Sequence, residues 1–144
     1  MAGTGAPEIL VADDEVAIAC CVAMLFRRAG HACRTVHDGL SAWRALKEDR
    51  PRLVVLDLQL PGLSGFELCS RIRADPELAS MHVLVLTGHG LSLRADWRRR
   101  VDADRFLLKP VDSRVLVEHV DDVLGQPSAD ELELPERDVV LPLA

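Results

Sequence analysis

The sequence predicts an α/β protein built on a doubly wound, five-stranded parallel sheet. Four short apolar runs are continuous rather than alternating in hydrophobicity, which is the pattern of strands buried on both faces. These runs are Ile9–Ala12, Leu53–Leu56, Val83–Leu86 and Phe106–Leu108. The stretches between them are long enough for the crossover helices that parallel pairing requires. Aromatic residues make up only 3% of the chain, so aliphatic side chains must fill the core.

The other elements fit between these strands in chain order. A first helix is predicted over Glu15–Ala29 because its apolar residues recur on one face, and Gly30 is placed to end it. Ala32–Val36 has a mixed pattern and is expected to form an edge strand. Further helices are predicted over Ser41–Glu48, Gly65–Ala74, Leu91–Arg99 and Ser113–Leu124. Asp112 precedes the last helix as its expected N-cap, and Val115 is counted on its apolar face.

The composition excludes several classes of protein. A length of 144 residues suits one domain. No apolar run reaches the roughly 20 residues that span a bilayer, and Met1–Glu8 lacks the pattern of a signal peptide. We therefore expect a cytoplasmic protein with no membrane partner. A net charge of −6 argues against direct nucleic-acid binding, so the basic stretch Trp97–Arg100 is expected to be a solvated or partner-facing helix end.

The four cysteines and five histidines show no metal-ligand spacing. Cys20 and Cys21 are adjacent, Cys33 and Cys69 stand alone, and there is no Cys-x-x-Cys. They are expected to be small, reduced, mainly apolar residues rather than parts of a disulfide or zinc framework.

The C-terminal stretch differs from the rest of the chain. From Gln126 to Ala144, five acidic residues face one base, Arg137, and this −4 is most of the net charge of −6. Three prolines interrupt it. We expect a domain over residues 1–125 followed by a mobile acidic tail over 126–144. The alternative is that Val139–Leu141 docks on a partner or on the domain.

Polar residues follow the ends of four predicted strands. Asp13 and Asp14 follow the first run, Asp57 the third strand, Thr87 the fourth and Lys109 the fifth. Ligands of open parallel sheets bind at the carboxyl ends of the strands, so these side chains are expected at one edge.

Three carboxylates placed together need positive charge. Two unit charges about 4 Å apart repel by roughly 4 kcal/mol at an effective dielectric near 20. Mg²⁺ meets this need because it prefers hard oxygen ligands and commonly bridges carboxylates to phosphate. Lys109 and the Thr87 hydroxyl are donors suited to phosphate oxygens, and Asp57 can act as a nucleophile that forms an aspartyl phosphate. Taken alone, Asp13 and Asp14 also fit solvated acids, with Asp14 capping the first helix.

These motifs together resemble the receiver domain of response regulators. They are Asp13-Asp14-Glu15, Asp57 followed by Leu60-Pro61-Gly62 and Gly65, Thr87-Gly88, and Lys109-Pro110. The resemblance covers about residues 8–125, in the family's order and at its usual intervals. It implies the flavodoxin-like strand order 2-1-3-4-5 with helices on both faces.

The resemblance also implies roles for individual residues. Asp57 is similar to the phosphoacceptor, Asp14 to the direct metal ligand and Asp13 to an acid that holds metal-bound water. Gln59 would offer its backbone carbonyl to the metal. Thr87 and Lys109 resemble the two phosphate-contacting residues, and the resemblance implies that Thr87 and Phe106 form the switch pair. The Lys109–Pro110 bond is similar to the family's cis peptide.

The function implied is a phosphorylation switch of a two-component system rather than an enzyme. A histidine kinase or a histidine phosphotransfer protein would supply the phosphoryl group. Output would pass to an unknown protein through residues 91–124, or along a phosphorelay, and a homodimer is possible. Two alternatives stay open. One is a haloacid-dehalogenase-like phosphatase, although that family has a second Asp where this chain has Gln59. The other is a degenerate receiver that only binds partners.

Overall fold

The computed structural model describes residues 7–88 and 101–125, and they form a five-stranded parallel sheet. The strand order is β2-β1-β3-β4-β5, as expected. The strands are β1 (Ile9–Ala12), β2 (Cys33–Val36), β3 (Leu53–Leu56), β4 (His82–Thr87) and β5 (Arg105–Leu108). The described helices are α1 (Val16–Arg28), α2 (Gly39–Asp49), α3 (Gly65–Ala74) and α5 (Ser113–Leu124).

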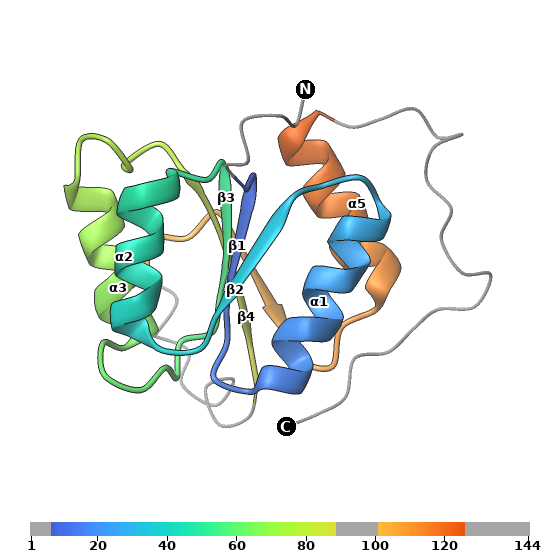
Figure 1. Ribbon diagram of the computed structural model, residues 1–144, viewed down its shortest axis with the longest axis horizontal. Helices are drawn as coiled ribbons and strands as arrows, with labels where there is room; N and C mark the ends of the chain where they lie inside the picture. The colour runs from blue at the N-terminus through green and yellow to red at the C-terminus, as the bar shows by residue number, and fades with distance from the viewer. Residues whose placement is uncertain (1–6, 89–100, 126–144) are drawn as a thin grey trace.

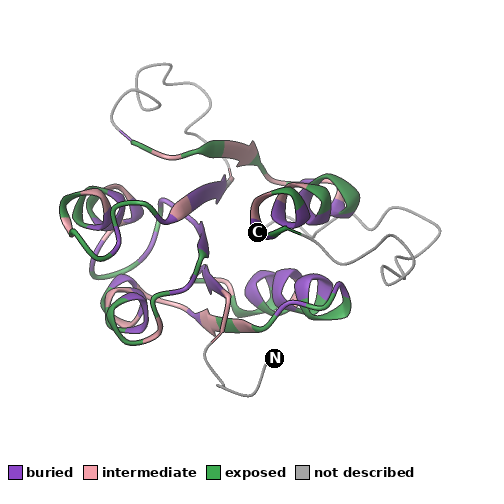
Figure 2. Cartoon of the chain, turned by 90° about the horizontal axis from the view of Figure 1, so that it is seen from above, coloured by how far each residue is buried: buried purple, intermediate pink, exposed green. Residues whose placement is uncertain are grey.

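The helices cover both faces of the sheet, which confirms the doubly wound prediction. Figure 1 shows α2 and α3 on one side of the strands and α1 and α5 on the other. Seen from above in Figure 2, the buried residues lie along the central strands and on the sheet-facing sides of the helices.

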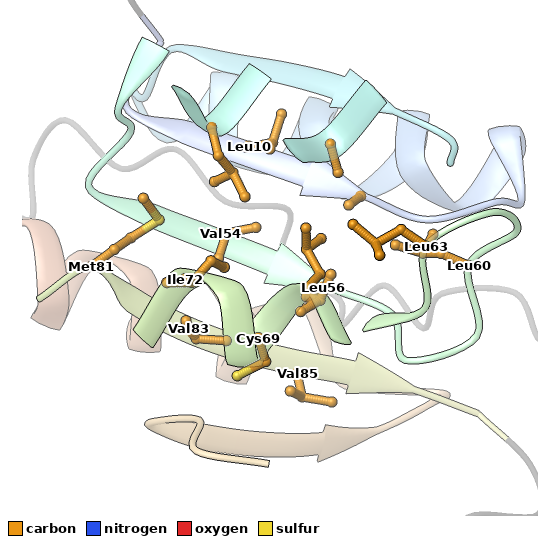
Figure 3. Close-up of a cluster of buried hydrophobic side chains, with 14 of the residues drawn as sticks. Leu10, Val54, Leu56, Leu60, Leu63, Cys69, Ile72, Met81, Val83 and Val85 are labelled. Atoms are coloured by element: carbon orange, nitrogen blue, oxygen red, sulfur yellow. The ribbon is translucent and has the colours of Figure 1, made fainter. Parts of the chain in front are cut away.

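Each central strand contributes to two hydrophobic clusters, because its side chains alternate between the faces of the sheet. From β3, Val54 and Leu56 pack under α2 and α3 (Figure 3), whereas Leu53 and Val55 pack under α1 and α5. β1 and β4 alternate in the same way. The continuous apolar runs at these three strands therefore predicted double burial correctly.

The two outer strands are less buried. β2 behaves as the predicted edge strand, since only Val36 is fully buried in it. The expectation that Phe106–Leu108 would be buried on both faces is wrong. Phe106 and Leu107 are half-buried and Leu108 is 42% exposed, because β5 pairs only with β4 in the described sheet.

The helix ends follow local capping rules. Gly30 has a φ of 101°, which an L side chain adopts poorly, and it follows α1 as predicted. Asp112 accepts a hydrogen bond from the Arg114 N–H at 2.8 Å and caps α5. Asp38 caps α2, so this helix begins two residues before the predicted Ser41. Val115 is 37% exposed rather than in the core.

Several expectations fall on residues outside the described ranges. These are the helix at 91–99, the basic stretch at 97–100 and the tail at 126–144. All four cysteines are in the described part of the chain, and each is a free thiol. Among the described helices, none has the length and apolarity required to cross a bilayer.

Replacing Asp38 with Ala tests the cap of α2. The Asp38 carboxylate accepts from the Ser41 N–H at 2.7 Å and from the Ser41 hydroxyl at 2.8 Å. Asp38→Ala is expected to lower the free energy of unfolding by about 1 kcal/mol, the usual cost of losing such a cap. Ser70→Ala, on the exposed side of α3, should change it by less than about 0.5 kcal/mol in the same urea titration. Equal losses in both variants would contradict the capping role.

Candidate functional site

The parallel register brings two acidic segments together at the carboxyl edge of the sheet. Ala12 ends β1 and pairs with Leu56, which ends β3. The next residues are Asp13 and Asp57, and the Asp57 N–H donates to the Ala12 carbonyl at 3.0 Å. The two carboxylates are therefore neighbours although they are far apart in the sequence.

Asp14 completes an acidic triad. One carboxylate oxygen from each of Asp13, Asp14 and Asp57 lies within 4.8 Å of the other two. Asp13 and Asp57 are 3% and 6% exposed, whereas Asp14 is exposed. The pocket is thus buried on one side and open to solvent at Asp14.

Lys109 inserts its ammonium group between the two buried acids. Its Nζ donates to Asp13 Oδ2 at 2.7 Å and to Asp57 Oδ2 at 3.1 Å. The Lys109 side chain is only 3% exposed. It reaches the acids from the end of β5, so three strands contribute to the site.

The charges in the pocket do not balance. Among the described residues, three carboxylates against one ammonium leave a formal charge of −2 (−3 + 1). Burial raises the pKa of Asp13 and outweighs its hydrogen bond to Lys109. Burial alone would lower the pKa of Lys109, but its hydrogen bond to Asp13 and the charge of Asp57 raise it overall.

This donor set fits a hard divalent cation. Carboxylate oxygens are the ligands that such cations prefer, and a charge of +2 would offset the excess negative charge of the pocket. Glu15, which follows Asp14 in the chain, has a buried Oε1 with no hydrogen-bond partner among the described residues. The acidic triad can therefore bind a metal ion.

The neighbours of the triad hold it in place. The Glu15 N–H donates to Asp13 Oδ1 at 2.9 Å, and the Gln59 N–H donates to Asp57 Oδ1 at 3.0 Å. Glu15 is also the N-cap residue of α1 and makes no side-chain cap, so the alternative that Asp14 caps this helix is wrong. His37 Nδ1 lies 3.0 Å from the Asp13 carbonyl. Sequence reasoning missed this contact, because nothing in the pattern around His37 connects it to Asp13.

Gly65 lets the start of α3 approach the acidic loop. A Cβ on Gly65 would collide with the Asp57 carbonyl oxygen and would lie 2.5 Å from Leu58 Cα. The Gly65 N–H donates to the Leu58 carbonyl at 3.0 Å. Only glycine permits this packing against the backbone of Asp57.

The structure also places three further features that the sequence analysis predicted for this site. Thr87 ends β4 and pairs with Leu108, which puts its backbone beside the residue before Lys109; its side chain is outside the described part. Phe106 pairs with Val85 and packs, half-buried, against the cluster under α2 and α3. The Lys109–Pro110 peptide is cis, as the resemblance implied.

The sequence of this chain is similar to those of known proteins with a receiver domain. The family model described as response regulator receiver domain matches residues 9–121. The transcriptional regulatory protein AfsQ1 of Streptomyces coelicolor is 36% identical over 110 residues, which is 76% of this chain and 48% of AfsQ1. This chain thus spans about half the length of the curated relatives it matches.

Solved structures of receiver domains have a similar fold. The receiver domain of NtrX from Brucella abortus has a TM-score of 0.69 and 37% identity, covering 81% of this chain and 98% of that one. A receiver domain of a signal transduction histidine kinase from Syntrophus aciditrophicus has a TM-score of 0.77 and 29% identity, covering 83% and 91%.

Substituting Gly65 tests how closely the acidic loop is packed. Gly65→Ala is expected to cost about 1–3 kcal/mol of unfolding free energy, since its Cβ meets backbone that cannot rotate away. The amide resonances of Asp57 and Gln59 should shift as the loop moves. Gly88→Ala is the matched control, because its Cβ would meet only Lys109 Cδ at 3.9 Å. A Gly65→Ala variant as stable as Gly88→Ala would disprove the packing requirement.

Proposed function

Because this chain belongs to the response regulator receiver domain family, we propose that it is a switch operated by phosphorylation of Asp57. The observation that carries this proposal is the arrangement of Asp57 beside Asp13, Asp14 and Lys109 at one edge of the sheet. The family places the chain in two-component signalling, so its phosphoryl donor is a histidine kinase or, we propose, a histidine phosphotransfer protein.

Mg²⁺ is the proposed metal of the site. Asp13, Asp14, Asp57 and the backbone carbonyl of Gln59 would hold it, and Asp13 would act through a bound water. When bound, Mg²⁺ neutralises charge on the transferring phosphoryl group. The support from this chain is its oxygen donor set and the formal charge of −2 that remains after Lys109 is counted.

Asp57 acts as the nucleophile in this proposal. A carboxylate oxygen of Asp57 forms a bond to phosphorus while the bond from phosphorus to the donor's imidazole nitrogen breaks. The leaving nitrogen keeps the electron pair. The Gln59 N–H and Lys109 Nζ bind different oxygens of Asp57, which fixes the plane of the carboxylate before the reaction.

Lys109 would stabilise the phosphorylated form of Asp57 from its present position beside the carboxylate. Its Nζ is already 3.1 Å from Asp57 Oδ2, so a phosphoryl oxygen added to Asp57 comes within reach of the ammonium group. The new charge of about −1.5 to −2 strengthens this contact. The Thr87 hydroxyl is the proposed donor to a second phosphoryl oxygen, supported by the place of Thr87 at the end of β4.

The proposed output face is residues 91–124, of which residues 101–124 are described. Movement of Thr87 toward Asp57 would be followed by Phe106 on the neighbouring strand, which would shift a two-state equilibrium of this face. We propose that the output passes through protein contact, including a possible homodimer, or through a phosphorelay. The net charge of −6 argues against direct nucleic-acid binding.

Two alternatives to the phosphorylation switch were a phosphatase and a receiver that only binds partners. The chain is a receiver domain rather than a haloacid-dehalogenase-like phosphatase. A receiver that only binds partners would not need an acidic triad with a buried lysine bound to two of its carboxylates. A cytoplasmic location and a mobile tail over 126–144 stay predictions.

Asp57→Asn is expected to abolish phosphorylation by acetyl phosphate, because an amide lacks the nucleophilic oxygen of a carboxylate. The measured quantity is acid-labile, hydroxylamine-sensitive phosphate on the protein in the presence of Mg²⁺. Asp102→Asn is the control, since the Asp102 side chain is 82% exposed and outside the triad. Labelling of Asp57→Asn at the wild-type level would show that another residue is the phosphoacceptor.

Asp14→Ala is expected to weaken Mg²⁺ binding by about tenfold or more, since a direct carboxylate–cation contact is worth several kcal/mol even at an effective dielectric of 20. Because Asp14 is exposed, the variant should keep the fold. Titration calorimetry measures the affinity, with Asp122→Ala, exposed on α5, as control. If both variants bound Mg²⁺ as tightly as the wild type, Asp14 would not be a ligand.

A further inference from the structure

Two histidines meet at the opposite end of the sheet from the acidic triad. His82 is the first residue of β4 and pairs with Leu53, the first residue of β3, whereas Asp57 follows the last residue of β3. The length of β3, about 13 Å at 3.3 Å per residue, thus separates the histidine pair from the acidic triad. His119 reaches His82 from α5.

The two imidazole rings point their Nε2 atoms at each other. The Nε2–Nε2 distance is 2.9 Å, with ring centroids 4.9 Å apart and ring planes at 51°. Two Nε2 atoms at this distance form a hydrogen bond only if one of them carries a proton. A positive ion between them would instead receive both lone pairs.

Both rings are in a state suited to donating these lone pairs. Burial lowers the pKa of His82 and of His119, so both are neutral near pH 7. Neutral imidazole nitrogen is the form that ligates metals.

The Asp104 carboxylate lies near the Nδ1 side of the His82 ring, beyond hydrogen-bond distance. Asp104 Oδ2 lies 3.7 Å from His82 Nδ1, and it is fixed by the Val83 N–H at 2.7 Å and by Arg73 Nη2 at 2.9 Å. A carboxylate on this side favours the tautomer with the proton on Nδ1, which leaves the Nε2 lone pair free. In metal sites a carboxylate often accepts a hydrogen bond from the second ring nitrogen of the ligating histidine, and a shift of a few tenths of an ångström would bring Asp104 into that position.

We propose that His82 and His119 form a binding site for a divalent transition-metal ion, Zn²⁺ in the first instance, which joins β4 to α5. Imidazole nitrogen suits Zn²⁺, Ni²⁺ and Cu²⁺, whereas Mg²⁺ prefers oxygen. The site is therefore chemically distinct from the acidic triad, and it does not depend on the proposed phosphorylation of Asp57.

Binding of a tetrahedral ion requires the two rings to move. Zn–N bonds of 2.0–2.1 Å at a tetrahedral angle put two ligand nitrogens about 3.3 Å apart. The rings must therefore separate by a few tenths of an ångström from 2.9 Å and turn so that both Nε2 lone pairs meet at the ion. The His82 side chain is 22% exposed and His119 is half-buried, so water can occupy the remaining coordination positions.

Titration calorimetry of the full chain with Zn²⁺ tests the proposal. Saturating Mg²⁺ keeps the acidic triad occupied, and a phosphine reductant keeps the four thiols reduced. The wild type is expected to bind about one equivalent of Zn²⁺ at this site. His82→Gln and His119→Gln should each weaken binding by about tenfold or more, since even loss of an indirect partner of a metal site commonly costs 10–100-fold.

Cys20→Ser is the matched control, because Cys20 is an exposed thiol that could bind Zn²⁺ by itself. It should leave the affinity unchanged. Wild-type affinity in both histidine variants, loss of binding in Cys20→Ser, or no binding by the wild type would each overturn the site.

Imidazole ¹⁵N spectra of the wild-type chain decide the question even if a histidine variant fails to fold. Zn²⁺ should shift the Nε2 resonances of His82 and His119 and leave those of His31, whose Nε2 is held by Asp121 at 2.7 Å, in place. Unmoved resonances of His82 and His119 at saturating Zn²⁺ would refute the proposal.

Discussion

The contact between Lys109 and two buried carboxylates is the interaction on which the site depends. Without the ammonium group, Asp13 and Asp57 would bring two negative charges together at 3% and 6% exposure, which is costly in a medium of low dielectric. With it, the described side chains of the pocket still carry a formal charge of −2 when Asp14 is counted. The fold thus partly neutralises a cluster of acids and leaves negative charge that a bound cation can offset.

The parallel sheet is what makes this cluster possible. Asp13, Asp57 and Lys109 are separated by dozens of residues, yet each follows a strand whose register is fixed by its neighbours. Register is fixed because β1, β3 and β4 bury both faces, and a slip of one residue would exchange the side chains of the two hydrophobic clusters. Gly65 adds a close backbone contact that holds the loop after Asp57.

Sequence reasoning succeeded where a feature depends on local pattern and failed where it depends on three-dimensional packing. The continuous runs at β1, β3 and β4 predicted buried strands, and the residues after them predicted the acidic triad. The same pattern at Phe106–Leu108 was misleading, because burial of an apolar run depends on its place in the sheet, and β5 is an outer strand. The His82–His119 contact joins residues 37 positions apart, and no spacing rule indicates such a pair.

α5 connects the chemistry at the two ends of the sheet. Lys109 and the Asp112 cap are three residues apart, so the ammonium group that contacts Asp57 is attached almost directly to the start of this helix. Two turns later the same helix places His119 against β4. A change in the contacts of Lys109 on the proposed phosphorylation would therefore act at the start of a helix whose later turns contact β4 through a pair of imidazoles. If a metal ion replaces the proton between those rings, the far end is held more firmly, and the response of α5 to phosphorylation depends on both sites.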